Sequence, residues 1–380
     1  MQSFDVIVLG LGGMGSAALY EAARRGMSVL GIEQFGLAHD RGSSHGATRI
    51  IRRAYFEHPN YVPLVDRSYE LWENLERESG RKLLTRCGLL LFGPPEGPII
   101  SGVKRAAQAY PMTIEELSRH DVTRRFAGFH PNPDMVALLE SDAGFLYVED
   151  CVRTYVERAR SLGAVARFET RVLDWDVSAS GVLVATTERK FTAKRLIVCA
   201  GPWSGKFLSD LHLPLEVRRK VVLWLRPAGH DYDLDKDCPI FGFDTPEGLF
   251  YGFPRIDARG VKVGDHTGGD AVATADDVAR TLNPGDAERI MRFTRQFMPG
   301  LSADILEHSI CLYTMTPDEH FIVDRHPRFA NIAYAAGFSG HGFKFAPIVG
   351  KTLVDLIDGS VNAAPIRFSD AVKPASPHTK

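Results

Sequence analysis

Short apolar runs and helical patterns alternate along most of this chain. Residues 5–9 read DVIVL, a β-branched run that suits a parallel strand buried on both faces. An Ala-rich helix is predicted over residues 16–25, where Gly26 would end it, and a second strand over residues 28–32. The chain therefore opens with a strand–helix–strand unit, the kind of unit from which parallel sheets are built.

The same patterns predict elements along the rest of the chain. Helices are expected over residues 60–79, 150–162, 279–296 and 347–357, with Asp150 as N-cap of the second and Gly163 and Gly359 as stops. Strands are expected at residues 88–93, 165–168, 172–175, 182–186, 195–200 and 332–336, with Ser180-Gly181 as a turn. A strand that runs into glycines and then a helix occurs at both ends of the chain. We therefore expect strands from both ends to belong to the first sheet, with other structure between them in sequence.

The first strand leads directly into three glycines, Gly10, Gly12 and Gly15, spaced as G-x-G-x-x-G. The first permits a tight turn, the second lets a pyrophosphate approach the backbone, and the third lets the helix lie close to the strand. Glu33 ends the second strand, where an acidic side chain meets a ribose hydroxyl. A turn that merely connects two elements is the alternative. The ordered context favours a dinucleotide site, without separating NAD from FAD.

Composition narrows the class of protein. A chain of 380 residues usually forms two domains, and 44% hydrophobic with 24% charged residues is typical of a soluble globular protein. The formal net charge of −2 provides no field that would favour nucleic acid or an anionic membrane. No apolar run approaches the length needed to span a bilayer. We therefore expect neither a nucleic-acid nor a membrane partner.

The cysteines and the termini indicate a cytoplasmic protein. The five cysteines, Cys87, Cys151, Cys199, Cys238 and Cys311, are odd in number and form no C-x-x-C pair, so neither a metal site nor a disulfide framework is expected. The odd count leaves room for one cysteine with a special role. The first strand begins too close to Met1 for a signal peptide, and the terminal His-Thr-Lys is not a peroxisomal address.

Two stretches carry unusual charge. HGATRIIRRAY places Arg49, Arg52 and Arg53 close together, either as a solvated basic face or as a fork for a carboxylate. The stretch GFSGHGFK, residues 337–344, leads into a helix, where glycines let the backbone approach a planar ring. An ordinary turn would not need its histidine and lysine, which favours function. By default Lys262 would be a solvent-facing strand residue and Cys311 a small buried hydrophobe.

Several motifs together resemble the sarcosine oxidase and N-methyl amino acid oxidase family, flavoproteins of the D-amino-acid-oxidase type. The resemblance spans nearly the whole chain. Its motifs are VLGLGGMG, HGATRIIRRAY, YVPLVDRSYELW, FYGFP, VKVGDHTGG, CLYTMTPDEHFIVDRHP and GFSGHGFK. It implies a mixed α/β fold in which a Rossmann-like FAD-binding domain (residues 1–88, 145–213 and 318–380) joins a substrate domain with an antiparallel sheet (residues 89–144 and 214–317).

The resemblance also implies the residues that hold the cofactor. Cys311 matches the cysteine that carries FAD as an 8α-S-cysteinyl thioether, so the glycines would hold the ADP end of FAD. Val172 matches a residue whose backbone meets the adenine end. Further residues expected at the cofactor are Glu33, Gly340, Gly342, Lys344 and the flavin neighbours His45, Thr48 and Arg49. Many bacterial members have aspartate where this chain has Ala47, but the matching histidine and arginine remain.

On the substrate side, the resemblance implies a clamp and an oxygen site. Arg52 and Lys344 match the pair that grips the substrate carboxylate, and Tyr251, Tyr313 and His266 match residues of the cavity wall. Lys262 matches the lysine beneath the flavin that promotes reaction with oxygen, because a fixed positive charge stabilises developing negative charge. Residues 239–248 form the stretch where substrate-facing side chains should differ among members, and no specificity is assigned from it.

The implied reaction is oxidation of a small secondary amino acid such as sarcosine, with oxygen and water, to glycine, formaldehyde and hydrogen peroxide. Three alternatives stay open: oxidation of a cyclic amino acid such as L-pipecolate or L-proline, oxidation of N-methyltryptophan, and a flavin dehydrogenase with an acceptor other than oxygen. A flavoprotein that only binds its ligand is a further class, which a turnover assay separates. The resemblance suggests a monomer.

Overall fold

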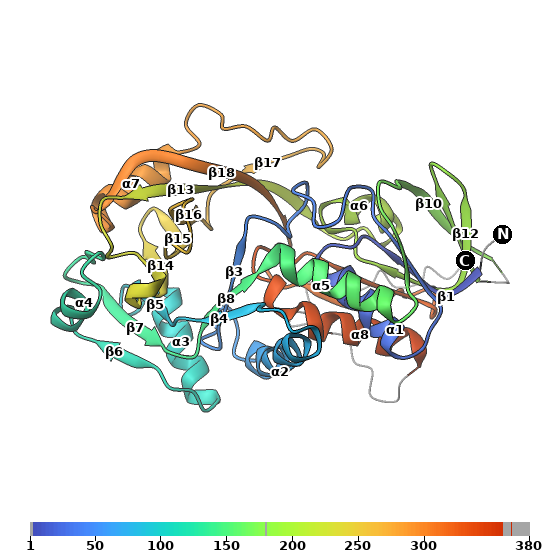
Figure 1. The fold of residues 1–380 in the computed structure, drawn as a ribbon, viewed down its shortest axis with the longest axis horizontal. Helices are drawn as coiled ribbons and strands as arrows, with labels where there is room; N and C mark the ends of the chain where they lie inside the picture. The colour runs from blue at the N-terminus through green and yellow to red at the C-terminus, as the bar shows by residue number, and fades with distance from the viewer. Residues whose placement is uncertain (1–2, 179–180, 360–365, 367–380) are drawn as a thin grey trace.

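A computed structural model describes residues 3–178, 181–359 and 366 of the chain. Figure 1 shows an elongated molecule with one sheet and its helices at each end. The helices are α1 (Gly13–Arg24), α2 (Tyr61–Ser79), α3 (Pro98–Ala109), α4 (Arg119–Arg125), α5 (Val148–Ser161), α6 (Ser204–Phe207), α7 (Glu288–Phe297) and α8 (Ala346–Asp358), with short 3₁₀ turns at Gly201–Trp203, Ser209–Leu211, Leu234–Lys236 and Phe343–Phe345.

The first sheet has a parallel centre in the order β9-β2-β1-β12-β20, with an antiparallel flap at one side. Its strands are β1 (Ser3–Leu9), β2 (Val29–Ile32), β9 (Val165–Arg167), β10 (Val172–Ser178), β11 (Gly181–Thr186), β12 (Lys190–Val198), β19 (Ile322–Arg325) and β20 (Ile332–Ala336). The two central strands bury both faces. Val6 and Val8 pack toward the helices, whereas Ile7 and Leu9 pack into a second core on the other face.

Helices α1, α2, α5 and α8 cover one face of this sheet (Figure 1). The fold closes here over a long sequence distance, because α8 lies against α1 although more than 300 residues separate them. Close approach of the two helices depends on Gly350, where a Cβ would stand 2.7 Å from the backbone of Ala17. The sheet is thus left after β12 and re-entered at β19, as the sequence predicts.

The second sheet is almost entirely antiparallel, in the order β17-β13-β16-β15-β14-β5-β7-β6, with β18 paired to β13. Its strands are β5 (Leu89–Gly93), β6 (Glu115–Leu117), β7 (Val136–Glu140), β13 (Glu216–Pro227), β14 (Ile240–Thr245), β15 (Gly248–Phe253), β16 (Val261–Asp265), β17 (Asp270–Ala271) and β18 (Leu301–Met315). One face packs on α7 through an aromatic core, which includes Phe243 and Phe293 with ring centroids 5.2 Å apart. The other face packs on α3.

A small third sheet lies between the two large ones. It consists of β3 (Thr48–Ile51), β8 (Gly144–Tyr147) and β4 (Leu84–Arg86), all antiparallel. Strand β3 carries the arginine-rich stretch into the middle of the molecule, and β8 runs directly into α5. This arrangement places β3 between the two large sheets (Figure 1).

Most predicted elements are confirmed, with four differences. The first helix begins at Gly13, not at residue 16, because the glycine turn leads straight into it. Helix α5 begins at Val148, so Asp150 lies in the first turn instead of capping it, where its charge still favours the helix N-terminus. Strand β12 covers Lys190–Val198 instead of 195–200. Ser180 of the predicted turn lies outside the described residues.

The fourth difference concerns the charged helix predicted over residues 279–296. Only Glu288–Phe297 is helical. The preceding segment contains Pro284 and Gly285, and Gly285 has φ +90°, so one helix cannot run through it. Arg219 holds the segment as a loop, because it donates hydrogen bonds to the carbonyls of Ala279 and Thr281 and pairs with Asp286. Within the described ranges, no helix is both long and apolar enough to cross a bilayer.

Candidate functional site

Two cavities meet in the middle of the molecule. The larger one begins at the glycine turn after β1 and, with the solvent-open space at its mouth, spans about 1280 Å³. The smaller one lies against the second sheet and spans about 690 Å³ counted in the same way. Both are lined by Arg49, Tyr313, Gly340 and Phe343, which therefore mark the junction. We call the larger cavity the cofactor groove and the smaller one the inner cavity.

The glycine turn forms the floor of the cofactor groove. Gly10 has φ +85°, and a Cβ there would stand 2.4 Å from the carbonyl oxygen of Cys199. Gly15 does not line the groove, but a Cβ there would be 1.8 Å from the oxygen of Gly10, so it permits the close helix–strand approach that the motif predicts. Gly12 and Gly13 line the groove at the N-terminus of α1, where the helix dipole favours a phosphate.

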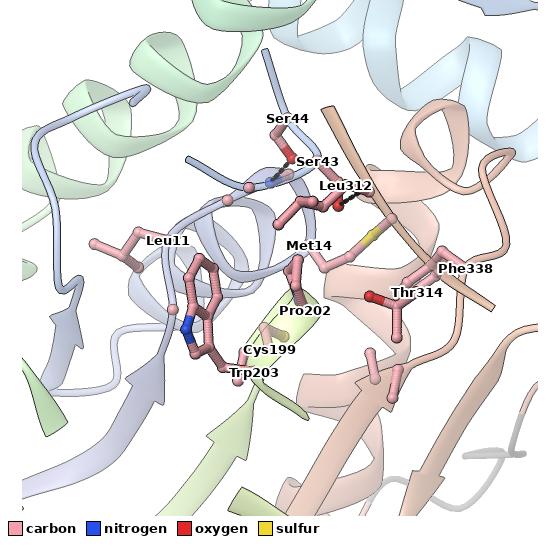
Figure 2. A pocket seen from close by; sticks show the side chains of 18 of the residues that line it. Leu11, Met14, Ser43, Ser44, Cys199, Pro202, Trp203, Leu312, Thr314 and Phe338 are labelled. Carbon is pink, nitrogen blue, oxygen red and sulfur yellow. Dashed lines mark hydrogen bonds between the residues drawn. The ribbon is translucent and has the colours of Figure 1, made fainter. Parts of the chain in front are cut away.

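The outer end of the groove carries the acidic side chain at the end of β2. Glu33 lines the groove, and its two carboxylate oxygens accept hydrogen bonds from the N–H groups of Leu11 (2.9 Å) and Phe35 (3.1 Å). Val172 and Trp203 line the same end. Figure 2 shows Trp203 and Leu11 flanking the groove. The glycine turn at the start of α1 and the acid at the end of β2 thus line one groove, as in a dinucleotide site.

A loop from the arginine-rich segment closes the groove from above. The hydroxyl of Ser44 accepts a hydrogen bond from the N–H of Gly13 at 3.0 Å, and the hydroxyl of Ser43 donates to the carbonyl of Leu312 at 2.5 Å (Figure 2). These two contacts tie the loop to α1 on one side and to β18 on the other. They position the side chains that follow in sequence, His45 and Arg49, at the inner end of the groove.

Cys311 lies at this inner end, buried beside His45 and Arg49. An N–H of Arg49 lies 3.5 Å from the sulfur, and Nδ1 of His45 lies 4.0 Å from it. Burial alone raises the pKa of a thiol, but His45 and Arg49 outweigh burial here and lower the pKa of Cys311 to about 5. The side chain is therefore a thiolate at neutral pH, the reactive form of cysteine. Cys311 therefore differs from most buried cysteines, which are unreactive and behave as small hydrophobic residues.

Lys262 is buried in the same region, not exposed on a solvent face. Its ammonium group donates to the carbonyls of Gly46 (2.6 Å) and Thr48 (3.0 Å) and to the hydroxyl of Thr48 (3.2 Å). Burial, with Arg49 nearby, holds the pKa of this ammonium well below its usual range. Three oxygen acceptors fix the side chain, which explains how Thr48 contributes without lining either cavity.

The charged wall of the inner cavity contains Arg52 and Lys344, both buried. The Arg52 guanidinium pairs with Glu57, 2.7 Å from each carboxylate oxygen, and lies 4.1 Å from the ring centroid of Phe56. Lys344 donates to the carbonyl of His341 at 2.6 Å, and burial with Arg52 nearby lowers its pKa to about 7. Although burial opposes it, Arg52 lowers the pKa of Glu57 to about 2. An anion that enters therefore meets two cations and one competing carboxylate.

Two neutral histidines complete this wall. Nε2 of His341 lies 2.8 Å from the carbonyl of Glu319, which only accepts, so Nε2 carries the proton and Nδ1 accepts from the hydroxyl of Tyr55 at 2.6 Å. Burial lowers the pKa of His341 to about 4. Burial and then Lys220 lower the pKa of His266 to about 3. Both imidazoles are therefore in the neutral form, with one ring proton, at neutral pH.

The predicted site residues fall into three groups. Arg49, Arg52, Lys344, Tyr251, Tyr313, His266, Gly340 and Gly342 line a cavity, as do Gly10, Gly12, Glu33 and Val172. His45, Thr48, Lys262 and Cys311 are buried behind the cavity surface, and Gly15 lies under the turn. Arg53 lies apart, because it pairs with Asp66 on α2.

Sequence reasoning missed several lining residues. Glu57 lies five positions after Arg52 and could have been found as the acid nearest to an arginine fork. His341 stood inside a predicted motif without an assigned role. Apolar residues such as Leu89, Leu91 and Gly242 carry no local signal, because only strand pairing brings them to the cavity.

Comparisons with known proteins agree with this geometry. A family model described as FAD dependent oxidoreductase matches residues 5–356. A monomeric sarcosine oxidase of Streptomyces avermitilis is 40% identical over 373 residues, 97% of each chain. An N-methyl-L-tryptophan oxidase of Escherichia coli is 34% identical over 93% of this chain and 94% of its own. The structure of NikD, described as an unusual amino acid oxidase, superposes with a TM-score of 0.83 at 25% identity and covers 98% of both chains.

Proposed function

Because this chain belongs to the family of FAD-dependent oxidoreductases, we propose that it is an amine oxidase that demethylates a small N-methyl amino acid, with sarcosine as the simplest substrate. The balanced reaction is sarcosine, oxygen and water to glycine, formaldehyde and hydrogen peroxide. The observation that carries the proposal is the junction of the cavities. The pair of cations at Arg52 and Lys344 opens onto the inner end of a groove with the features of a dinucleotide site.

The groove fits FAD. Side-chain-free turns at Gly10 and Gly12 leave room for a pyrophosphate, and Glu33 stands at the ribose end. At the other end, a thiolate at Cys311 would hold the flavin covalently as an 8α-S-cysteinyl thioether. When bound, FAD supplies a two-electron acceptor that takes a hydride equivalent from the substrate and passes the electrons to oxygen.

The residues of the inner cavity bind and orient the substrate. Arg52 and Lys344 attract its carboxylate. When the substrate binds, the Arg52 guanidinium either releases Glu57 and binds the substrate carboxylate or binds both carboxylates. Tyr251, Tyr313 and the neutral His266 form the wall beside the junction, where the reacting carbon has to lie. The substrate nitrogen must be a free amine to give up a hydride equivalent, and neither neutral histidine supplies charge that would favour this form. Activity is therefore expected to rise with pH as the amine loses its proton.

Lys262 in its protonated form places a positive charge near Arg49 and Cys311, although burial holds its pKa well below the usual range. Three oxygen acceptors hold the ammonium in place, so little reorganisation is needed when negative charge develops on oxygen. This supports an oxidase instead of a dehydrogenase with another acceptor. Cyclic amino acids and N-methyltryptophan remain alternative substrates for the same clamp.

We further propose that the protein is a monomer and that it works in a reducing cytoplasm. The second part is supported by the five cysteines, none of which forms a disulfide. The division into a cofactor domain (residues 1–88, 145–213, 318–380) and a substrate domain (89–144, 214–317) is part of the proposal. It is supported by the membership of β1 and β20 in one sheet and of β5 and β16 in the other.

Turnover tests the reaction. Purified protein should be supplied in turn with sarcosine, N-methyl-L-alanine, L-pipecolate and L-proline. Each compound that is a substrate should give oxygen uptake and peroxide release in equal amounts, and the proposal expects this of the two N-methyl amino acids. With the two N-methyl substrates, formaldehyde should match both. Peroxide without formaldehyde from the cyclic amino acids alone would favour the first alternative, and reduction of a dye without oxygen uptake would favour a dehydrogenase.

A further inference from the structure

The second sheet presents an apolar face to the inner cavity. Side chains alternate along its strands, so Leu89 and Leu91 of β5 share one face with Leu249 and Tyr251 of β15. Residues such as Leu90, Phe92 and Phe243 point to the opposite face and pack on α7. The cavity face is therefore a row of large apolar and aromatic side chains.

Gly242 interrupts this row at its centre. In strand β14 it pairs with Leu91 on one side and with Tyr251 on the other, and all three residues line the inner cavity. The backbone does not require glycine here, because Gly242 is not among the residues with positive φ. A glycine inside a strand weakens it by about 0.5–1 kcal/mol and often marks a place where a ligand approaches closely. The absence of a side chain at position 242 therefore affects the space in the inner cavity and not the backbone conformation.

The space beside Gly242 is bounded by movable atoms. A Cβ built there would stand 2.8 Å from Cδ2 of Leu91, 3.9 Å from the carbonyl oxygen of Phe250 and 4.0 Å from Cδ1 of Leu249. The two leucine atoms are ends of flexible side chains, so a larger residue at position 242 would push Leu91 into the cavity. Apart from the one main-chain oxygen the nearest neighbours are carbon, with no charged group among them, and the space suits an apolar substituent.

The other directions around a bound substrate are already assigned. Its carboxylate lies toward Arg52 and Lys344, and its N-methyl carbon faces the junction at Arg49 and Tyr313, because that carbon is oxidised. The substituent left over is the side chain on the α-carbon. The apolar row around Gly242 is the part of the lining that remains for it.

We propose that Gly242 is a specificity-determining residue, whose missing side chain lets the inner cavity accept N-methyl amino acids with a branched apolar side chain in preference to sarcosine. This inference rests on the proposed function and narrows its substrate class. One methylene group in an apolar pocket changes kcat/KM by about tenfold or more. We therefore expect kcat/KM for N-methyl-L-leucine to exceed that for sarcosine by at least about tenfold.

Substitution of Gly242 tests the assignment. In Gly242→Val, kcat/KM for N-methyl-L-leucine should fall about 10- to 100-fold, whereas kcat/KM for sarcosine should change less than about threefold, because sarcosine does not reach the gap. Phe243→Leu is the matched control, since it lies in the same strand but faces α7; it should leave the ratio of the two substrates unchanged. N-isobutylglycine places the same branch on nitrogen and should gain nothing over sarcosine. A preference for it that Gly242→Val abolishes would overturn the assignment to the α-side chain.

A binding measurement separates the role of Gly242 from the reaction. Calorimetry on the flavin-containing protein should show tighter binding of 4-methylpentanoate than of acetate, and Gly242→Val should remove the difference. If this holds while no N-methyl amino acid is turned over, the proposed reaction is wrong and the role of Gly242 stands. Equal binding of the two acids to the unsubstituted protein would refute the role of Gly242, whichever substrate is oxidised.

Discussion

The cofactor groove and the inner cavity share a boundary but are built in opposite ways. The floor of the groove is main chain and glycine that lie close together in sequence, around Gly10, Gly12 and Glu33, and later segments supply its walls. The inner cavity is lined by six segments, residues 49–57, 89–91, 241–253, 266, 313 and 340–344, and its charged residues Arg52 and Lys344 are buried. A site made of main chain tolerates the loss of one side chain. A site made of desolvated charges does not, because each charge is balanced by the others.

The largest effect is expected at Lys262, which is buried behind the cavity surface and bound to the main chain of Gly46 and Thr48. Lys262→Met should lower oxygen uptake about 10²- to 10³-fold, because a preorganised charge near the oxygen site is lost. Reduction of the flavin by substrate without air should persist, which shows that the variant still folds and binds. The matched control is Lys194→Met, an exposed lysine paired with Asp5. Oxygen uptake equal to that of the control would remove Lys262 from the oxygen reaction.

A smaller loss is expected at the carboxylate clamp. Arg52→Met should lower kcat/KM about 30- to 100-fold, equivalent to about 2–3 kcal/mol, since a charge-assisted hydrogen bond to the substrate is lost and Glu57 stays buried without its partner. Arg53→Met provides the comparison at the next position, because Arg53 pairs with Asp66 outside both cavities. Steady-state kinetics on both variants measure the difference. Equal losses would mean that the effect is structural.

The titration of Lys344 gives a pH dependence of moderate size. Burial and Arg52 lower its pKa to about 7, so the ammonium is charged below that pH and neutral above it. Acetate is an anion between about pH 6 and pH 9. Its affinity should therefore be constant below about pH 7 and fall above it, by at most about tenfold per pH unit. Lys344→Arg keeps the charge and should flatten the profile. An affinity that rises with pH in the unsubstituted protein would contradict the assignment.

The smallest effect belongs to the groove. Glu33→Gln keeps one acceptor oxygen and loses one of the two hydrogen bonds to Leu11 and Phe35, so the free energy of unfolding should fall by about 1 kcal/mol. Urea denaturation measures this, with Glu70→Gln on the exposed side of α2 as the control. A fall in the free energy of unfolding of about 2–3 kcal/mol, as large as the loss of transition-state stabilisation expected in Arg52→Met, would show that the groove depends on single side chains.

The same contrast explains what the sequence could predict. The groove follows from local patterns, because a glycine turn, a helix start and a strand-end acid act within about thirty residues. The inner cavity depends on which strands pair. Gly242 lies in the stretch 239–248 that the resemblance marks as substrate-facing, but its place between Leu91 and Tyr251 is known only once β14 lies between β5 and β15. Charge patterns drew attention to Arg52 and Lys344, but their pairing as a clamp came only from resemblance to a known family. Glu57 was missed because an acid beside arginines is usually a surface ion pair.

The helix predicted over residues 279–296 failed for a local and a distant reason. Pro284 and Gly285 lie inside it and could have been read from the sequence, because a proline in a helix interior costs about 3 kcal/mol. Arg219 from a distant strand also binds the carbonyls of its first part. Only that second contact is fixed by the completed fold.

The account depends on the flavin lying at the inner end of the groove, where the two cavities meet, and acid precipitation tests this most directly. The purified protein is precipitated with acid, the pellet is digested, and the flavin-bearing peptide is sequenced, with Cys311→Ser as the control. We predict that the yellow colour stays with the pellet, that it maps to Cys311, and that the variant releases free FAD. Flavin attached to another residue, or a preparation that folds without flavin, would contradict the placement of the cofactor and with it the junction of the two cavities.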